Sequence, residues 1–302
     1  MRGARSPSRG LLRLYFPALL TWLALLAAPF AHADAGQHSL WQVQGKRNVV
    51  YLMGSIHVLR ESDYPLPPAL LQAYADSKSV VMEIDLNEMD APDVQQEMMQ
   101  AAMLPEGQSL RSLLGPDRYQ RASTLAGALG VELATFDGFA PWFVAEAISQ
   151  LQLMQLGFEP TAGVDMFFMN RARSDGKSTL GLETAHDQIA LFQSMPQERQ
   201  AQYLMASLEQ AKSLPSQVNQ MVSAWRRGDV AWFNRQMREE FGRDPELYQS
   251  LLAARNRKWI SKIEALLNQD KNYLVIVGTG HLAGEGSVVD LLKRDGLSVT
   301  QR

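Results

Sequence analysis

The chain carries two copies of one motif, one near each end of the sequence. Residues 47–57 read RNVVYLMGSIH and residues 271–281 read KNYLVIVGTGH. Each copy contains a basic residue, an Asn, a run of five mostly apolar residues and then Gly-x-x-His. Such a run predicts a buried β-strand, and Gly54 and Gly278 are expected to provide backbone freedom where each strand breaks. We therefore expect a histidine just beyond the carboxyl end of each strand.

Strands and helices alternate along the rest of the chain. We predict strands at 49–53, 79–86, 177–183, 273–277 and 297–301, and a further short strand at 131–138. Apolar residues at helical spacing, bounded by Pro or Gly, predict helices at 66–77, 91–104, 115–130, 141–157, 163–176 and 286–296, and helices alone from 196 to 270. The strand–helix–strand order of residues 49–86 predicts a right-handed crossover and a parallel pair. We expect an α/β fold with a mostly parallel sheet and large helical insertions in the middle region, about 90–270.

The first 33 residues have the features of a secretory signal peptide. Four Arg residues and no acidic residue come before the apolar run LYFPALLTWLALLAAPF, and the small-residue site Ala31-His32-Ala33 follows it. We expect cleavage after Ala33, transport across the inner membrane to the periplasm and no stable membrane anchor afterwards. Residues 34–302 would then form a single domain. The alternative is an uncleaved N-terminal anchor.

Composition narrows the range of functions. Of the 29 Lys and Arg residues, four precede residue 34, so the remaining 25 face 32 Asp and Glu residues and the net charge is about −7. A mildly acidic chain is a poor partner for nucleic acid. The chain has no Cys, so the fold needs no disulfide and any side-chain metal ligand must be His, Asp or Glu.

Four polar residues are expected to meet at one edge of the sheet. Glu83 and Glu183 end two of the predicted strands, and His57 and His281 follow two others. In parallel α/β sheets, ligands bind beyond the carboxyl ends of the strands. These side chains are spread over more than 200 positions, but the predicted topology places them together.

Two further polar residues lie near this set. Arg255 is four residues after Leu251 and four before Trp259, so the three share one helix face. A guanidinium on an apolar stripe needs a carboxylate or an anionic ligand, unless its stem packs while its head reaches solvent. His186 follows Glu183 at the E-x-x-H spacing that can bind metals in helical bundles, but it falls at a strand-to-helix junction and we leave its role open.

Taken together, these residues resemble the TraB/GumN family, which includes the Tiki-type proteases. The resemblance spans almost all of residues 34–302. His186 is not part of the family pattern. The matching motifs are Gly54-Ser-Ile-His57, Glu83-Ile-Asp85, Gly163-Val164-Asp165, Gly181-Leu-Glu-Thr184 with Gln188, Arg255-Asn256 and Gly278-Thr-Gly-His281.

The resemblance implies a fold and a chemistry. The fold would be shared with erythromycin-esterase-like and ChaN-like proteins, in which two related α/β halves surround a cleft. The chemistry would be hydrolysis of a polypeptide or a small molecule. Tiki-type members resemble metal-dependent proteases of secreted proteins, whereas the esterase-like relatives use a His as general base on water. Two residues of the matching motifs, Asp165 and Asn256, are assigned to substrate binding.

Two His and one Glu can also form an open three-ligand metal site, as they do for catalytic zinc. We assign His57, His281 and Glu83 as ligands and Glu183 as general base or fourth ligand. Arg255 would steady an oxyanion or a substrate carboxylate. These ligand types suit Mn, Co and Zn alike, so the sequence predicts a divalent metal without identifying it.

Three hypotheses about function stay open at this point. The first is a periplasmic hydrolase, a divalent-metal-dependent peptidase whose site is built from the two Gly-x-x-His motifs. The second is a metal-free hydrolase in which His57 is the general base and Glu83 orients it. The third is a haem- or metal-binding protein without turnover. The sequence identifies neither the substrate nor the oligomeric state.

Overall fold

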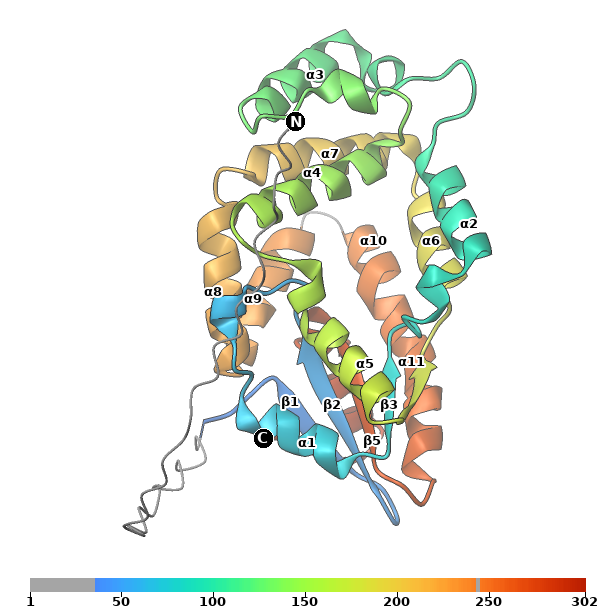
Figure 1. Cartoon of the computed structure of the whole chain (residues 1–302), viewed down its shortest axis with the longest axis vertical. Coiled ribbons are helices and arrows are strands. Elements are labelled where there is room, and N and C mark those ends of the chain that lie inside the picture. Colours follow the sequence, from blue (N-terminus) through green and yellow to red (C-terminus); the bar gives the residue numbers. More distant parts are fainter. Residues whose placement is uncertain (1–35, 243–244) are drawn as a thin grey trace, which may run out of the picture. The chain divides into compact units, whose positions relative to one another are not determined.

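A six-stranded sheet forms the centre of the fold (Figure 1). The structure is a computed structural model, and it describes residues 36–242 and 245–302. The expected signal peptide, residues 1–33, lies outside the described residues. The sheet has the order β4-β3-β5-β2-β1-β6. Its strands are β1 (Leu40–Gln44), β2 (Val49–Ser55), β3 (Ser79–Met82), β4 (Ser178–Gly181), β5 (Tyr273–Gly278) and β6 (Val299–Gln301).

Most of the sheet is parallel, as predicted. Strands β2, β5, β3 and β4 pair in parallel, whereas β1 pairs antiparallel with β2 and β6. Strand β1 was not predicted, because the five-residue stretch LWQVQ is too short and too polar to stand out. The predicted strand at 131–138 is wrong. Residues Leu133–Phe136 form a 3-10 turn instead, and only Leu133 of that turn is buried.

The two motif strands, β2 and β5, are direct neighbours in the sheet. Strands β2 and β3 are parallel, but they do not pair with each other as predicted, because β5 lies between them. Five of the six residues of β5 are buried, and a strand that is apolar on both sides belongs in the interior of a sheet. The pairing places Ser55 opposite Gly278, so the two motif turns leave the same sheet edge side by side.

Most helices begin and end close to the predicted positions, but the one predicted at 115–130 spans Leu110–Gly127, and no bounds were predicted for Ala185–Gln193. Pro68, Pro92 and Pro141 each occupy the first turn of a helix, where a missing N–H costs nothing. Helix α11 follows a single π-helical turn, Gln249–Ala253. The helices are α1 (Pro68–Asp76), α2 (Pro92–Ala102), α3 (Leu110–Gly127), α4 (Pro141–Gln155), α5 (Val164–Ser174), α6 (Ala185–Gln193), α7 (Gln197–Gln210), α8 (Leu214–Arg226), α9 (Val230–Phe241), α10 (Pro245–Tyr248), α11 (Ala254–Leu267) and α12 (Val288–Arg294).

Helices cover both faces of the sheet. On one face, Met53 and Ile276 pack against Phe168 of α5 and Trp225 of α8 in a core that also includes α1. On the other face, the alternate strand residues pack against α11 and α12, for example through Trp259. The period of two along a strand, which sends successive side chains to opposite faces, produces these two cores.

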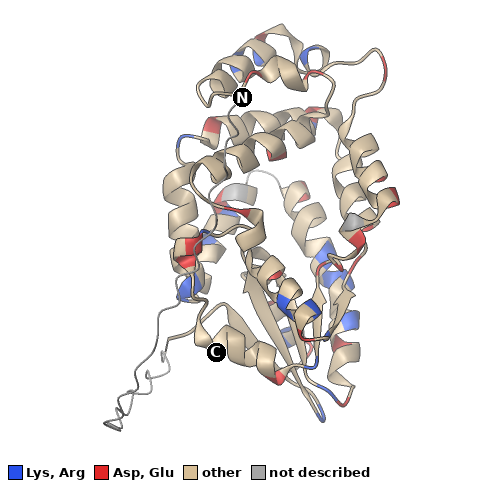
Figure 2. Cartoon of the chain, in the orientation of Figure 1, with Lys and Arg blue, Asp and Glu red and all other residues tan. Residues whose placement is uncertain are grey.

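The remaining helices form cores of their own. Helices α3, α4 and α7 pack around one apolar cluster, and α2, α4 and α6 contribute to another. Helix α4 belongs to both, and Figure 1 shows it beside α7. Among the described helices, none combines the length and the apolar character needed to span a membrane. Figure 2 shows that Lys and Arg positions are interspersed with Asp and Glu positions along the helices and loops.

Candidate active site

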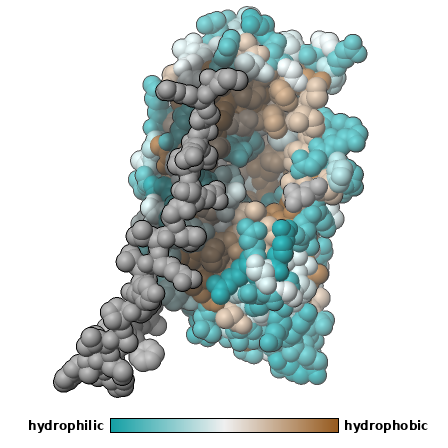
Figure 3. Space-filling view, in the orientation of Figure 1, coloured by the Kyte–Doolittle hydropathy of each residue, from teal (hydrophilic) through white to brown (hydrophobic). Residues whose placement is uncertain are grey.

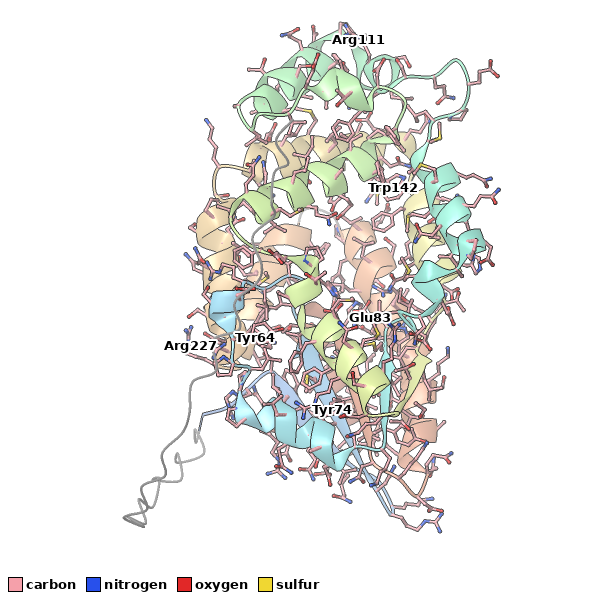
Figure 4. All side chains as sticks on the ribbon, viewed as in Figure 1. Tyr64, Tyr74, Glu83, Arg111, Trp142 and Arg227 are labelled. Carbon is pink, nitrogen blue, oxygen red and sulfur yellow. The ribbon has the colours of Figure 1, made fainter. Side chains whose placement is uncertain are left out.

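A cleft of about 630 Å³ opens at the carboxyl ends of β2 and β5. Both motif turns line it, together with Glu83, which is labelled in Figure 4, and Arg255. Residues of α4 line the cleft as well, and α8 and α9 contribute apolar residues such as Met221 and Phe233. The cleft therefore combines polar groups at the sheet edge with walls formed by the helical part.

The motif glycines provide space for other side chains. A Cβ on Gly54, which lies inside β2, would approach the threonine hydroxyl of the second motif to 2.7 Å. A Cβ on Gly278 would lie 3.3 Å from Glu83 Oε1, 3.6 Å from His57 Nε2 and 3.8 Å from His281 Cδ2. Neither glycine has a positive φ, so the expectation that they provide backbone freedom is wrong. Gly278 marks the point around which the three polar side chains gather.

Glu83 directly follows β3 and is held as a carboxylate. Its Oε1 accepts a hydrogen bond from the Gly278 N–H at 2.7 Å, and its Oε2 accepts one from Arg255 Nη2 at 2.6 Å. Burial alone would raise the pKa of Glu83, but the positive charges of His281, Arg255 and His57 lower it to about 2. Arg255 stays charged throughout the neutral range, so we expect Glu83 to be ionised there.

Arg255 is the second residue of α11 and is fixed by five neighbours, of which His281 is described below. Its Nε lies 3.0 and 3.2 Å from the two carboxylate oxygens of Glu183, and its Nη2 donates to Glu183 as well as to Glu83. Its Nη1 donates to the carbonyl of Leu251 at 3.1 Å, and its Cζ lies 4.9 Å from the centre of the Trp259 ring. The predicted common face is confirmed for Arg255 and Trp259, whereas Leu251 lies in the π-helical turn and contacts Arg255 through its backbone carbonyl. The guanidinium is turned toward carboxylates, with only 11% of the side chain exposed.

Glu183 holds Arg255 in place and does not line the cleft. It lies two residues beyond β4, and 9% of its side chain is exposed. Besides Arg255, it accepts hydrogen bonds from Gln188 Nε2 at 3.0 Å and from Trp259 Nε1 at 3.2 Å. Its two oxygens are thus both occupied by donors. In this arrangement Glu183 positions the guanidinium rather than meeting a substrate.

His281 is buried, and its hydrogen bonds define its tautomer. Its Nδ1 lies 2.6 Å from Asn256 Oδ1, while the Asn256 amide nitrogen donates to the carbonyl of Gly286 at 2.9 Å. Nδ1 therefore carries the proton, and Nε2 is left to accept from Arg255 Nη1 at 3.1 Å. Burial lowers the pKa of His281 to about 4. The ring is consequently neutral at pH 7.

His57 is more accessible, with 64% of its side chain exposed in the cleft. Its Nδ1 lies 3.2 Å from Asp165 Oδ2 in the first turn of α5. Although the ring is open to the cleft, the surrounding protein removes part of its hydration, which disfavours the charged form. The hydrogen bond to Asp165 and the charges of Asp165 and Glu83 outweigh this loss and raise the pKa of His57. The ring is therefore held at one nitrogen by a carboxylate and presents the other to the cleft.

The structure places the remaining predicted residues around this centre. Asp165 and Asn256, predicted to bind substrate, each hold one histidine, and Asn256 is only 1% exposed. His186 does not line the cleft, and its Nδ1 contacts the carboxylate of Glu97. Sequence reasoning missed that Gln188 donates to both buried glutamates. It also treated the apolar residues of 196–270 only as core, although several of them line the cleft.

The histidine and glutamate side chains of the site are of the types that bind divalent cations. No three His, Asp or Glu side chains among the described residues are close enough to hold a metal ion as they stand. Even so, His57 and His281 each have Nδ1 held by a neighbouring oxygen, as metal-ligating histidines do. His281 Nε2 and Glu83 Oε1 are 3.8 Å apart, and two ligands of a tetrahedral zinc ion lie about 3.4 Å apart. Because Arg255 uses the same lone pair of His281, a metal would have to displace this hydrogen bond.

A family profile and several known proteins match this chain over most of its length. The sequence profile of the TraB/PrgY/gumN family matches residues 39–301. The uncharacterized protein YbaP of Escherichia coli (strain K12) is 26% identical over 263 residues, which cover 85% of this chain and 94% of YbaP. Metalloprotease TIKI2 of Danio rerio is 24% identical over 317 residues, which cover 86% of this chain and 60% of TIKI2. No solved structure matches the chain.

Proposed function

The chain belongs to the TraB/PrgY/gumN family, and from this membership we propose that it is a hydrolase that cleaves amide bonds of polypeptides in the cleft beyond β2 and β5. One observation carries the proposal. His57, Glu83 and His281 gather within 4 Å of a Cβ position on Gly278, at the sheet edge where α/β enzymes bind their ligands. The name of the relative TIKI2, a metalloprotease, supports peptide hydrolysis as the reaction class.

We propose that His57, His281 and Glu83 hold a divalent metal ion in the active protein. When bound, such an ion lowers the pKa of a water molecule and polarises the carbonyl of the scissile bond. The electrostatics of His57 support this assignment. The negative charges that raise its pKa, Asp165 and Glu83, create a potential that favours any cation near Nε2.

The protein's own residues would prepare the site for this chemistry. Asp165 and Asn256 each bind the Nδ1 of one histidine, which directs both Nε2 atoms into the site. The Gly278 N–H and Arg255 keep Glu83 ionised. Arg255 also supplies a fixed positive charge that can stabilise a developing oxyanion.

A metal-free route through the same cleft is the second candidate, and one observation favours it. Arg255 Nη1 already donates to the Nε2 of His281, so this nitrogen is not free. In that route the His57–Asp165 pair moves the proton, with His57 Nε2 accepting it from water and returning it to the leaving amine. The raised pKa of His57 would then move the rising limb of activity to higher pH.

The test is digestion of a peptide library by protein purified without a nickel column, either chelated or supplied with Mn²⁺. We expect cleavage with metal only, and about one bound metal ion per chain by elemental analysis. His57→Ala and His281→Ala should lose metal and reduce cleavage by at least about 100-fold. His186→Ala is the matched control, because this histidine contacts Glu97 outside the cleft. It should retain both properties.

The other outcomes separate the alternatives. Cleavage that is unchanged by the chelator and by His281→Ala, but is lost in His57→Ala, would identify the metal-free route. Metal binding, or a Soret band on adding haem, without any cleavage would identify a binding protein.

We also propose that the chain is exported to the periplasm. The basic and apolar character of residues 1–33 supports this, as does the site Ala31-His32-Ala33. N-terminal sequencing of protein from the cell envelope should find Asp34 as the first residue. A first residue of Met1, with the protein retained in the membrane, would contradict the proposal.

A further inference from the structure

An apolar side pocket of about 360 Å³ adjoins the cleft. Figure 3 shows apolar residues gathering in the hollowed part of this face. The two hollows share five lining residues, all of them apolar: Val58, Leu153, Met221, Phe233 and Met237. A substrate that reaches the polar residues of the cleft would therefore lie directly beside an apolar pocket.

Both motif turns adjoin the wall of this pocket. Val58 directly follows His57 in the chain. Met237 packs on the second turn, where a Cβ on Gly280 would lie 3.4 Å from Met237 Sδ. Phe233 is only 4% exposed and belongs to the core cluster that packs on β2 and β5. The wall is thus fixed relative to the polar residues that would act on the substrate.

The lining of the side pocket favours an apolar occupant. Among the residues that the structure describes, no Lys or Arg lines it, and the polar ones that do are three Gln residues and Glu239. A carboxylate side chain entering it would lose hydration without gaining a cationic partner. Met221 and Met237 have flexible thioether side chains, which adapt to occupants of different shape.

We propose that the side pocket is a specificity site that receives a large apolar side chain, Leu, Met or Phe, of a polypeptide substrate next to the bond that the cleft cleaves. This inference rests on the proposed hydrolase function. Burying such a side chain rather than Ala favours binding by about tenfold to hundredfold.

The probes are quenched decapeptides of Gly and Ser that differ at one position, which is Leu, Phe, Ala or Asp. Binding is measured by fluorescence anisotropy and cleavage by loss of quenching, on the full chain as exported. The Leu and Phe peptides should bind about tenfold to hundredfold more tightly than the Ala peptide, and the Asp peptide should bind most weakly.

Met221→Lys should abolish the preference for Leu and improve binding of the Asp peptide, because it introduces a cation into the pocket. Met154→Lys is the matched control, since Met154 is 52% exposed and does not line the pocket. It should leave the preference unchanged. If circular dichroism shows that Met221→Lys does not fold, Met221→Ala is the second variant. It enlarges the pocket and should shift the preference from Leu toward Phe.

The two assays distinguish the two proposals. A preference for Leu and Phe in binding, without cleavage of any peptide, would refute the hydrolase and uphold the pocket. Equal or undetectable binding of the Leu, Phe and Ala peptides would overturn the pocket, even if cleavage occurs. A preference that neither Met221 variant changes would overturn it as well.

Discussion

Arg255→Met tests whether the buried charge network stabilises the fold. Arg255 bonds to the carboxylates of Glu83 and Glu183 through four nitrogen–oxygen contacts. Only 11% of the Arg255 side chain, 13% of that of Glu83 and 9% of that of Glu183 are exposed. Removing the guanidinium leaves two carboxylates in one buried site without the cation that bonds to both of them. The methionine preserves much of the stem volume, so the loss of charge dominates the effect.

The expected cost follows from this burial. Breaking a buried ion pair by removing one partner costs about 3–5 kcal/mol, against a total stability of about 5–15 kcal/mol for a typical domain. Hydrogen bonds from the Gly278 N–H and Trp259 Nε1 remain and keep the cost within that range. Without the guanidinium between them, the two negative charges repel each other and raise the pKa of one carboxyl group. The loss should therefore shrink as the pH falls from 8 toward 5, when one carboxylate takes up a proton.

The assay is equilibrium urea unfolding of chelated protein, followed by tryptophan fluorescence at several pH values. Arg118→Met is the matched control. Arg118 also bonds to the carbonyl four residues earlier and to both oxygens of one glutamate, Glu198, but these side chains are 41% and 59% exposed. That variant should unfold close to the unsubstituted protein, because solvent screens exposed pairs.

Adding Glu183→Gln to Arg255→Met should recover part of the loss, because it removes one of the two unpaired charges. The reasoning is refuted if Arg255→Met loses no more stability than Arg118→Met, or if its loss is the same at pH 5 and pH 8.

Three further predictions concern single groups of the site. In chelated protein, His281 protonates near pH 6.5 when unfolded and only near pH 4 when folded, so the unfolded chain binds the proton first. The free energy of unfolding should therefore fall by roughly 3 kcal/mol as the pH is lowered from 6.5 to 4. His281→Gln should remove that fall, as measured by urea unfolding at a series of pH values. Asp165→Asn should lower the raised pKa of His57, as measured by NMR titration of the imidazole; an unchanged pKa would exclude Asp165 as the cause. Gly278→Ala should fold normally, because its φ is −51°, but a Cβ 3.6 Å from His57 Nε2 should reduce peptide cleavage at least about tenfold. Gly127→Ala, where a Cβ has no neighbour within 4 Å, should affect neither cleavage nor melting temperature.

The sequence by itself determined the features that depend on local periodicity. The apolar runs of the two motifs became β2 and β5, and the helices with Pro in their first turns formed where predicted. The histidines follow the strand ends, because a strand and its turn are set by adjacent residues. The common face of Arg255 and Trp259 is also a local property, since residues four apart in a helix are neighbours.

Only the tertiary structure decided which of these groups meet. Sequence order suggested β2 beside β3, but β5 separates them, because an almost wholly buried strand is most stable inside the sheet. The bond from Arg255 to Glu183 spans 72 residues, and the one to Glu83 spans 172. Such pairings depend on strand order and register, which a local pattern does not encode.

The role of each polar residue was decided at the same level. Glu183 was predicted to be the general base or a fourth metal ligand, yet it binds Arg255. Asn256 sets the tautomer of His281 from a position that is 1% exposed. The wall of Met221 and Phe233 read as ordinary core, because an apolar helix face has the same pattern whether it meets another helix or a cleft. Residue type and spacing set what each side chain can do, and packing decides which partner or ligand it meets.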